Sequence, residues 1–179
     1  MKIIYRPTEG LAVIQPFSVR DIRGEFVKTY RRSDFDRMGM KEVFVEDFYS
    51  VSNKGVVRGM HYQSPPHGHG KLVYCVRGRA LDVVVDLRAS SSTFGEAYSF
   101  TLSEHDKCML YMEEGFAHGF YAFEDETVMV YKTTSEYAPD SDVGIRYDSF
   151  GFCWPGGVPV VSARDMLLPA FSKDNRYFR

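Results

Sequence analysis

Four polar side chains have the types that proton transfer next to a carbonyl group requires: His61, Lys71, Tyr131 and Asp165. A neutral histidine, with an ordinary pKa of about 6.5, is a natural base for a moderately acidic C–H group. A carboxylate behind the imidazole would fix its tautomer, and a cation such as Lys71 or Arg58 could hold the enolate oxygen. Tyr131 could return the proton from the opposite face. Spacing alone does not show that these residues meet, so Tyr131 as a core residue and Asp165 as a helix cap stay open alternatives.

Most of these groups lie on or beside predicted strands in the middle of the chain. Apolar-rich runs that predict strands occupy residues 56–63, 71–77 and 80–87. The segment 64–70 contains two prolines and two glycines, so it is predicted to be a loop. Gly78 and Arg79 separate the last two runs and predict a tight hairpin.

Polar residues interrupt these strands in two places. Asp82 and Asp86 share one face of a strand, because side chains alternate with a period of two. This pattern fits a half-exposed strand with solvated carboxylates as well as it fits a site. Arg58 and His61 are three residues apart and would face opposite ways on a regular strand. We expect a bulge at Gly59 to turn both inward.

The histidines raise the question of a metal site. A His-x-His pair such as His67 and His69, joined by a distant residue such as His118, holds Fe, Mn or Zn in many β-barrel proteins. The carboxylate expected three or four residues after the second histidine is missing, and Lys71 would place a positive charge beside the ion. We therefore predict no metal, and a flexible, exposed loop around His67 and His69.

The rest of the chain reads as further short strands. They are predicted at residues 11–15, 25–30, 42–52, 96–102, 108–112, 119–123 and 127–134, with the last four forming two pairs across turns. Ser33 and Gly39 are predicted to begin and end a short helix, and Ser162 to open another. Many strands spaced about 8–12 residues apart predict an antiparallel sandwich or barrel.

Composition limits the class of protein. The 179 residues are predicted to form a single domain, 1–179, with a substantial core. A net charge of −2 without a basic run argues against nucleic-acid binding. No stretch approaches the roughly 20 apolar residues that span a bilayer, and the N-terminus lacks the features of a signal peptide. Three cysteines without a CxxC motif predict reduced thiols in a cytoplasmic protein.

The sequence resembles the nucleotide-sugar 3,5-epimerase family, that of dTDP-4-dehydrorhamnose 3,5-epimerase. The segments that carry the resemblance run in family order over nearly the whole chain: DIRGEF (21–26), GVVRGMHYQ (55–63), PP (65–66), KLV (71–73), DVVVDLR (82–88), STFG (92–95), GFAHGF (115–120), YK (131–132), WP (154–155) and SARD (162–165). The resemblance implies an all-β fold, a cupin-type jelly-roll barrel with a few short helices at its periphery. It also implies a homodimer with exchanged strands that uses no metal and no cofactor.

The resemblance also implies roles for individual residues. His61 matches the base that removes the proton next to the C4 ketone, with Asp165 as its partner. Tyr131 matches the acid that reprotonates from the other face. The residues that match groups holding the C4 oxygen, the sugar or the diphosphate are Lys71, Arg58 and His118. The residues that match contacts to the diphosphate and the nucleotide base are Arg23 and Phe26.

Three departures from the family pattern fall where that family recognises nucleotide and sugar. Lys28 stands where a glutamate is common, and Glu46 and Phe48 stand where glutamine and asparagine are common. Gly68-His69 replaces Ala-Gln. Lys28 and Glu46 could form a new ion pair with each other. We therefore hypothesise that the chemistry is kept while the nucleotide, the sugar or the positions epimerised differ.

Three functions are compatible with the sequence. The first is epimerisation of a nucleotide-linked 4-keto-6-deoxy sugar at C3, C5 or both, for surface polysaccharide or other glycosides. The second is a metal-dependent cupin enzyme such as a dioxygenase. The third is a non-catalytic sugar-nucleotide binding protein, which would not require an acid and a base on opposite faces.

Overall fold

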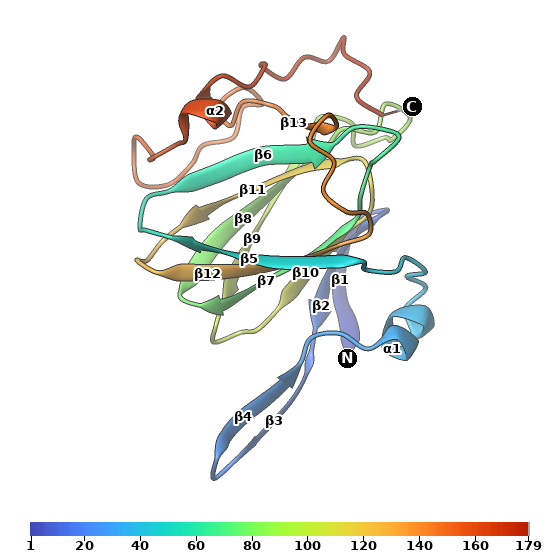
Figure 1. Ribbon diagram of the computed structural model, residues 1–179, viewed down its shortest axis with the longest axis vertical. Coiled ribbons are helices and arrows are strands. Elements are labelled where there is room, and N and C mark those ends of the chain that lie inside the picture. The colour runs from blue at the N-terminus through green and yellow to red at the C-terminus, as the bar shows by residue number, and fades with distance from the viewer. Residues whose placement is uncertain (179) are drawn as a thin grey trace.

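The computed structural model describes residues 1–178, and these are mostly β-strands (Figure 1). A six-stranded sheet has the order β1 (Lys2–Thr8), β2 (Leu11–Gln15), β10 (Met109–Met112), β7 (Lys71–Arg77), β12 (Thr127–Thr133), β5 (Glu46–Ser52). A five-stranded sheet has the order β13 (Asp142–Gly144), β6 (Val57–Gln63), β11 (Phe116–Ala122), β8 (Arg79–Asp86), β9 (Ala97–Ser103). All the strand pairs are antiparallel, and the two sheets form a cupin-like jelly roll.

Consecutive strands mostly cross from one sheet to the other. Strand β7 pairs with β10 and β12, whereas β8 pairs with β11 and β9. The predicted hairpin at Gly78 and Arg79 is therefore wrong, as are the two strand pairs predicted after residue 96. Each of these turns is a corner at which the chain changes sheets. Turn residues indicate that the chain reverses but not which strand it will pair with, so local sequence could not separate a hairpin from a corner.

Three apolar clusters cover both faces of the sheets. The largest fills the space between the sheets and includes Val73, Val84 and Phe120. A second packs helix α1 (Arg32–Arg37) against the outer face of the six-stranded sheet, and a third packs the C-terminal segment against the five-stranded sheet. Both faces of β8 are consequently buried, and Asp82 and Asp86 are fully buried rather than solvated. The half-exposed strand considered from the alternation pattern is not formed.

Several predicted elements have other boundaries. Helix α1 is preceded by Arg31 and has no side-chain cap, so Ser33 is not its N-cap. Instead, the buried carboxylate of Asp34 receives hydrogen bonds from Arg31. The strand predicted from residue 42 begins only at Glu46, and β1 was not predicted at all. The short C-terminal helix α2 (Ala163–Met166) does begin after Ser162, as predicted.

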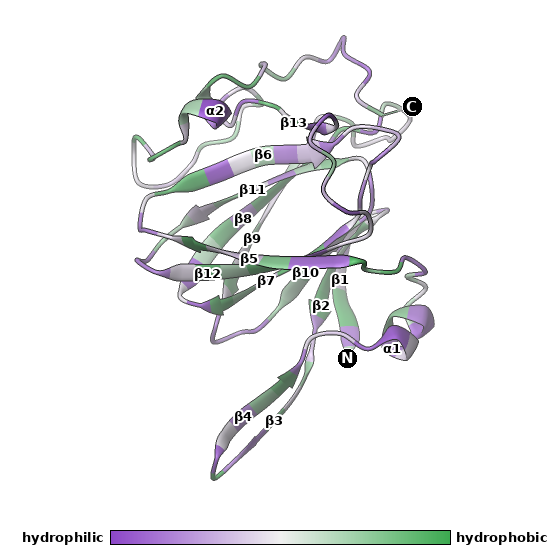
Figure 2. Cartoon of the chain, viewed as in Figure 1, coloured by the Kyte–Doolittle hydropathy of each residue, from purple (hydrophilic) through white to green (hydrophobic). Residues whose placement is uncertain are grey.

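Strands β3 (Phe17–Asp21) and β4 (Gly24–Lys28) form a separate two-stranded ribbon. The ribbon extends away from the two sheets (Figure 1), and hydrophobic residues lie along it (Figure 2). Phe17, Val19 and Phe26 on this ribbon are all about half exposed. A two-stranded ribbon is only marginally stable alone in water, so this one is suited to packing against another surface.

Candidate active site

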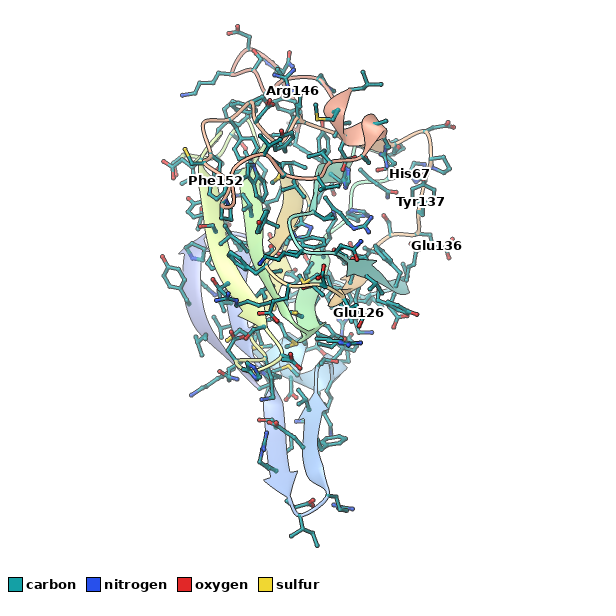
Figure 3. All side chains as sticks on the ribbon, turned by 90° about the vertical axis from the view of Figure 1, so that its left-hand side faces the viewer. His67, Glu126, Glu136, Tyr137, Arg146 and Phe152 are labelled. Atoms are coloured by element: carbon teal, nitrogen blue, oxygen red, sulfur yellow. The ribbon has the colours of Figure 1, made fainter. Side chains whose placement is uncertain are left out.

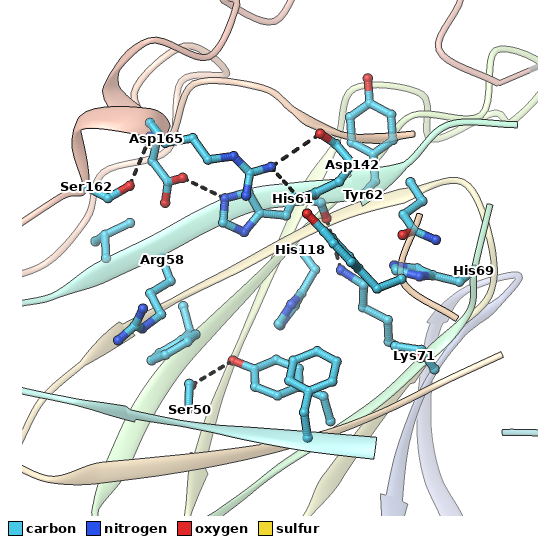
Figure 4. Close-up of a pocket in the computed structure, with 18 of the residues that line it drawn as sticks. Ser50, Arg58, His61, Tyr62, His69, Lys71, His118, Asp142, Ser162 and Asp165 are labelled. Carbon is cyan, nitrogen blue, oxygen red and sulfur yellow. Dashed lines mark hydrogen bonds and ion pairs between the residues drawn. The ribbon is translucent and has the colours of Figure 1, made fainter. Parts of the chain in front are cut away.

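A cavity of about 700 Å³ opens between the two sheets beside the C-terminal segment. Its walls come from both sheets, so residues far apart in sequence converge on it (Figure 4). The site residues predicted from the sequence that line it are His61, Lys71, Tyr131, Asp165, Arg58, His118, Glu46 and Phe48.

His61 and Asp165 form an imidazole–carboxylate pair on one wall. His61 Nε2 lies 2.8 Å from Asp165 Oδ1, and the backbone N–H of Gly59 donates to Asp165 Oδ2 at 3.2 Å. Burial acts to raise the pKa of the Asp165 carboxyl, but these hydrogen bonds and the His61 ring outweigh it and lower that pKa below its ordinary value. The pair leaves the other ring nitrogen of His61 available to a substrate. Asp165 is not the helix cap, because the side chain of Ser162 accepts from the Asp165 N–H.

The predicted bulge at Gly59 orients Arg58 and His61 toward the same cavity. Strand β6 pairs His61 with His118 and Arg58 with Phe120, so two residues of β6 oppose one of β11. Gly59 has φ +137°, and a Cβ there would lie 2.6 Å from the Cα of Gly119. Only glycine fits this close approach of two backbones.

Lys71 and His118 lie deeper in the cavity. Lys71 Nζ donates to the backbone oxygen of His61 at 3.1 Å, and burial lowers the pKa of its ammonium to about 8 despite nearby Asp142 and Asp82. His118 Nε2 lies 2.8 Å from Asp82 Oδ2, which makes a second imidazole–carboxylate pair. Burial raises the pKa of the Asp82 carboxyl.

Tyr131 lies on the opposite wall, on the six-stranded sheet. Its hydroxyl is 3.4 Å from the Ser50 hydroxyl, and its ring stacks on Phe48 with centroids 4.8 Å apart. Burial raises the pKa of the Tyr131 phenol, so it remains protonated at neutral pH. Although Tyr131 belongs to the core cluster, its hydroxyl edge faces the cavity.

Arg58 lies on the same wall as His61. Its guanidinium donates to the Ser52 hydroxyl at 2.9 Å and to the backbone oxygen of Val51 at 3.0 Å. These bonds hold a permanent positive charge beside the cavity, where it can attract an anionic group.

The other predicted site residues lie outside this cavity. Arg23, Phe26 and Lys28 are on the β3–β4 ribbon, away from the cavity of their own chain. Arg23 pairs with Asp21 at 2.6 Å, and Lys28 Nζ lies 5.9 Å from the centre of the Phe26 ring. The hypothesised ion pair between Lys28 and Glu46 is not found within residues 1–178.

Several residues that line the cavity were not predicted from the sequence: Ser50, Gln63, Tyr137, Asp142 and Arg164. Asp142 and Arg164 form an ion pair of 2.7 Å across the C-terminal segment, and no local pattern could have predicted it. The exposed loop predicted for both loop histidines is half right. His67 is exposed near Glu136 and Tyr137 (Figure 3), but His69 faces the cavity. Its position two residues before Lys71 was the available signal, because such residues share a face.

The metal-dependent alternative gains no support from the geometry. Within residues 1–178, no group of three or more His, Cys, Asp or Glu side chains is arranged to hold a metal ion. The site considered from the sequence would need His67, His69 and His118 together, but His67 is exposed and only His69 and His118 line the cavity. No helix in the same range is long and apolar enough to cross a membrane.

The protein is an epimerase of the jelly-roll class, and its cavity has a carboxylate-paired imidazole on one wall and a protonated phenol on the other. The family model described as dTDP-4-dehydrorhamnose 3,5-epimerase matches residues 6–173, and the chain belongs to that family.

Individual relatives agree with this assignment. The dTDP-4-dehydrorhamnose 3,5-epimerase of Shigella flexneri is 40% identical over 93% of each chain. The crystal structure of the Bacillus anthracis enzyme with TDP and PPi bound superposes with a TM-score of 0.93 at 32% identity, covering 95% of this chain and 99% of that one. The dTDP-4-dehydrorhamnose 3-epimerase of Streptomyces niveus is 37% identical over 93% of this chain and 83% of its own.

Proposed function

We propose that the protein epimerises a dTDP-linked 4-keto-6-deoxy sugar by proton transfer at the carbons next to the C4 ketone. The observation that carries this proposal is that His61, on the five-stranded sheet, and Tyr131, on the six-stranded sheet, lie on opposite walls of one cavity. Inversion of a carbon centre needs a base on one face and an acid on the other. An imidazole paired with a carboxylate suits the first role, and the protonated phenol of Tyr131 suits the second.

His61 is the proposed base. Its free ring nitrogen takes the proton from C3 or C5. The C–H bonding electrons then form a double bond between that carbon and C4, and the π electrons of the C4 carbonyl move onto the C4 oxygen. Asp165 stabilises the imidazolium that forms. Lys71 holds the enolate oxygen, since its ammonium is charged below a pH of about 8.

Tyr131 is the proposed acid. Its phenol gives a proton to the opposite face of the enolate, the electrons return from oxygen to re-form the ketone, and the carbon is inverted. The phenolate then recovers a proton from solvent, and His61 loses the proton it took. The ketone already makes the neighbouring C–H groups acidic, so the reaction requires no cofactor.

A homodimer is the proposed working unit, formed by single-domain chains that exchange the β3–β4 ribbon. The ribbon carries Arg23, Phe26 and Lys28 away from the cavity of its own chain, and its apolar side chains lack a cover there. In the dimer these three residues complete the cavity of the partner subunit. Arg23 and Lys28 would face the diphosphate there, and Phe26 the nucleotide base.

Three residues are positioned to alter which sugar nucleotide the protein prefers and which carbons it inverts. Glu46 and Phe48 line the cavity beside Tyr131, and Lys28 lies on the ribbon. Because Phe48 supports the ring of Tyr131, it affects which carbon the phenol can reach. The product of such a reaction would serve rhamnose-type deoxy-sugar synthesis in the cytoplasm, including O-antigen and lipopolysaccharide.

The deciding experiment is NMR of the protein with dTDP-4-keto-6-deoxyglucose in D₂O. We expect deuterium to appear at C3 and C5, with inverted product trapped by a 4-ketoreductase. Deuterium at C3 alone would assign the protein to the 3-epimerases. Absence of exchange at both carbons, with a correctly folded protein, would overturn the proposed function.

A further inference from the structure

His69 is a half-buried residue whose two ring nitrogens are buried and have no hydrogen-bond partner in the part of the chain that the structure describes. Among residues 1–178, three buried side-chain polar atoms lack a hydrogen-bond partner, and two of them are the ring nitrogens of His69. The other imidazoles that line the cavity, His61 and His118, each lie against a carboxylate. Buried polar groups are almost always paired, so an unpaired imidazole at a cavity wall indicates a missing ligand.

The backbone on both sides of His69 is held by hydrogen bonds, which keep the residue in the cavity wall. The Gly70 N–H donates to the Thr134 hydroxyl at 2.8 Å, and the Thr134 N–H donates back to the Gly70 oxygen. On the other side, the His67 oxygen accepts from Gln63 at 2.7 Å and from Ser135 at 3.0 Å. These bonds tie the segment to β6 and to the residues after β12.

The surroundings of His69 decide which ligand it can take. Burial, together with the charges of Lys71 and His118, lowers the pKa of the His69 ring to about 3. The ring is therefore neutral and offers one N–H donor and one acceptor nitrogen. A hydroxyl group, which both donates and accepts, matches a neutral imidazole, whereas a diphosphate would call for a cation.

The position of Lys71 indicates which hydroxyl groups of the sugar His69 can reach. His69 and Lys71 are two residues apart and lie on the same side of the cavity (Figure 4). If Lys71 holds the C4 oxygen, His69 lies beside that oxygen. In a 4-keto-6-deoxyhexose the C5 side carries only the methyl group and the ring oxygen, while C2 and C3 carry hydroxyls.

We propose that His69 determines sugar specificity by forming a hydrogen bond with the C2 or C3 hydroxyl of the hexose. This inference rests on the proposed function, because it takes the ligand of the cavity to be a nucleotide-linked hexose. His69 is not required to move a proton. It contributes binding that a deoxygenated sugar cannot use, since such a sugar leaves the buried ring unpaired.

The test uses sugar nucleotides that cannot react. Affinities for dTDP-glucose, dTDP-2-deoxyglucose and dTDP-3-deoxyglucose are measured by calorimetry with the wild type and with H69L, H69Q and H67L. The wild type is expected to bind dTDP-glucose roughly five- to a hundredfold more tightly than one of the deoxy analogues. H69L should lose that preference, H69Q should keep part of it, and H67L, at the exposed histidine, should keep all of it.

Thermal melting adds a second readout. H69L should melt at the same or a higher temperature than the wild type, because the substitution removes an unpaired buried polar group. A purely structural role would instead lower the melting temperature and leave the preference for the hydroxyl intact. Retention of the full preference by H69L would overturn the inference.

The outcome separates this inference from the proposed function. Deuterium exchange in the wild type with unchanged sugar preference in H69L would refute only the role of His69. Hydroxyl-dependent binding that H69L abolishes, without exchange in the wild type, would refute only the epimerase. A wild type that neither binds dTDP-glucose nor catalyses exchange would refute both.

Discussion

Two imidazole–carboxylate pairs face one cavity, but their different surroundings favour different roles. The His61 side chain is 29% exposed, so a substrate can reach it, whereas the His118 side chain is 4% exposed. The pKa is lowered for the Asp165 carboxyl and raised for the Asp82 carboxyl. Environments that separate two titratable groups in this way assign separate functions to them. The His61 pair therefore suits proton transfer, and the His118 pair suits a fixed wall of the cavity.

The variants D165N and D82N test this distinction. D165N should lower kcat by roughly 10²-fold or more, because an amide cannot stabilise the imidazolium of His61. D82N should lower kcat by less than about tenfold, since Asp82 acts only through His118. Rates of deuterium exchange at C3 and C5 measure both effects. Equal losses in the two variants would contradict the separation of roles.

Tyr131 can be tested apart from the base. Y131F removes the phenolic proton and keeps the ring that stacks on Phe48. We expect deuterium exchange by His61 to persist while formation of the inverted product falls by roughly 10²-fold. NMR in D₂O with a reductase trap reports both quantities. A parallel fall in exchange and inversion would show that Tyr131 is not the reprotonating acid.

Lys71 gives the reaction a pH dependence. Burial lowers the pKa of its ammonium from 10.5 to about 8, so the charge proposed to hold the enolate oxygen is present below a pH of about 8 and lost above it. We expect kcat/KM of the wild type to fall as the pH rises through about 8. K71R stays charged, and its residual activity should lack this alkaline fall. A wild-type profile that stays flat up to pH 10 would contradict the assigned role.

The same shift affects stability in the opposite direction. The folded protein releases the Lys71 proton near pH 8 and the unfolded chain near pH 10.5, so this group's contribution to stability rises with pH between those values. Below pH 8 both states are protonated, and the cost of burying the cation is constant. Loss of activity above pH 8 would thus not reflect unfolding caused by this group.

At the scale of elements, strand identity was far easier to predict than strand pairing. The apolar runs locate β2, β6, β7, β8 and β12 to within a residue or two, because their residue types favour strands wherever they pair. Pairing depends on contacts distant in sequence, which turn residues do not report. Of the site, the bulge at Gly59 was predictable, whereas the Asp142–Arg164 pair depends on where the C-terminal segment crosses the cavity.

Among the residues that shape the strands, Gly59 is the one whose substitution we expect to be most damaging. G59A would place a methyl group within 2.6 Å of the Gly119 backbone and displace the N–H that donates to Asp165. We expect a loss of stability above about 3 kcal/mol, measured by urea unfolding, together with loss of activity.

G151A is the matched control, because Gly151 has φ +77° but no atom within 4 Å of its added Cβ. It should cost only about 1–2 kcal/mol. Equal costs would exclude the close approach as the cause.

At the scale of the whole molecule, exchange of the ribbon formed by β3 and β4 predicts that each active site is built from residues of two chains. A chain carrying H61A has a defective cavity, and a chain carrying R23A and F26A has a defective ribbon. Each alone should be nearly inactive. If equal amounts of the two chains mix at random in ribbon-exchanged dimers, about a quarter of all sites combine an intact cavity with an intact ribbon. Activity should then recover to about a quarter of the wild-type level. Refolding the two chains together, with each refolded alone as the control, measures this. No recovery despite mixed dimers would place Arg23 and Phe26 outside the partner's site.

The alternation of strands between the two sheets also governs how the chain can acquire its structure during synthesis. Strand β7 lies between β10 and β12, and β6 lies between β11 and β13, so the middle of the chain cannot pair until much later residues have been made. At about 5–20 residues per second on the ribosome, β7 waits several seconds with both edges open. High contact order of this kind makes folding slow, in the range of milliseconds to seconds, even after release. Rapid overproduction would therefore favour aggregation through the open edges of β6 and β7, and slower synthesis at low temperature should raise the soluble yield.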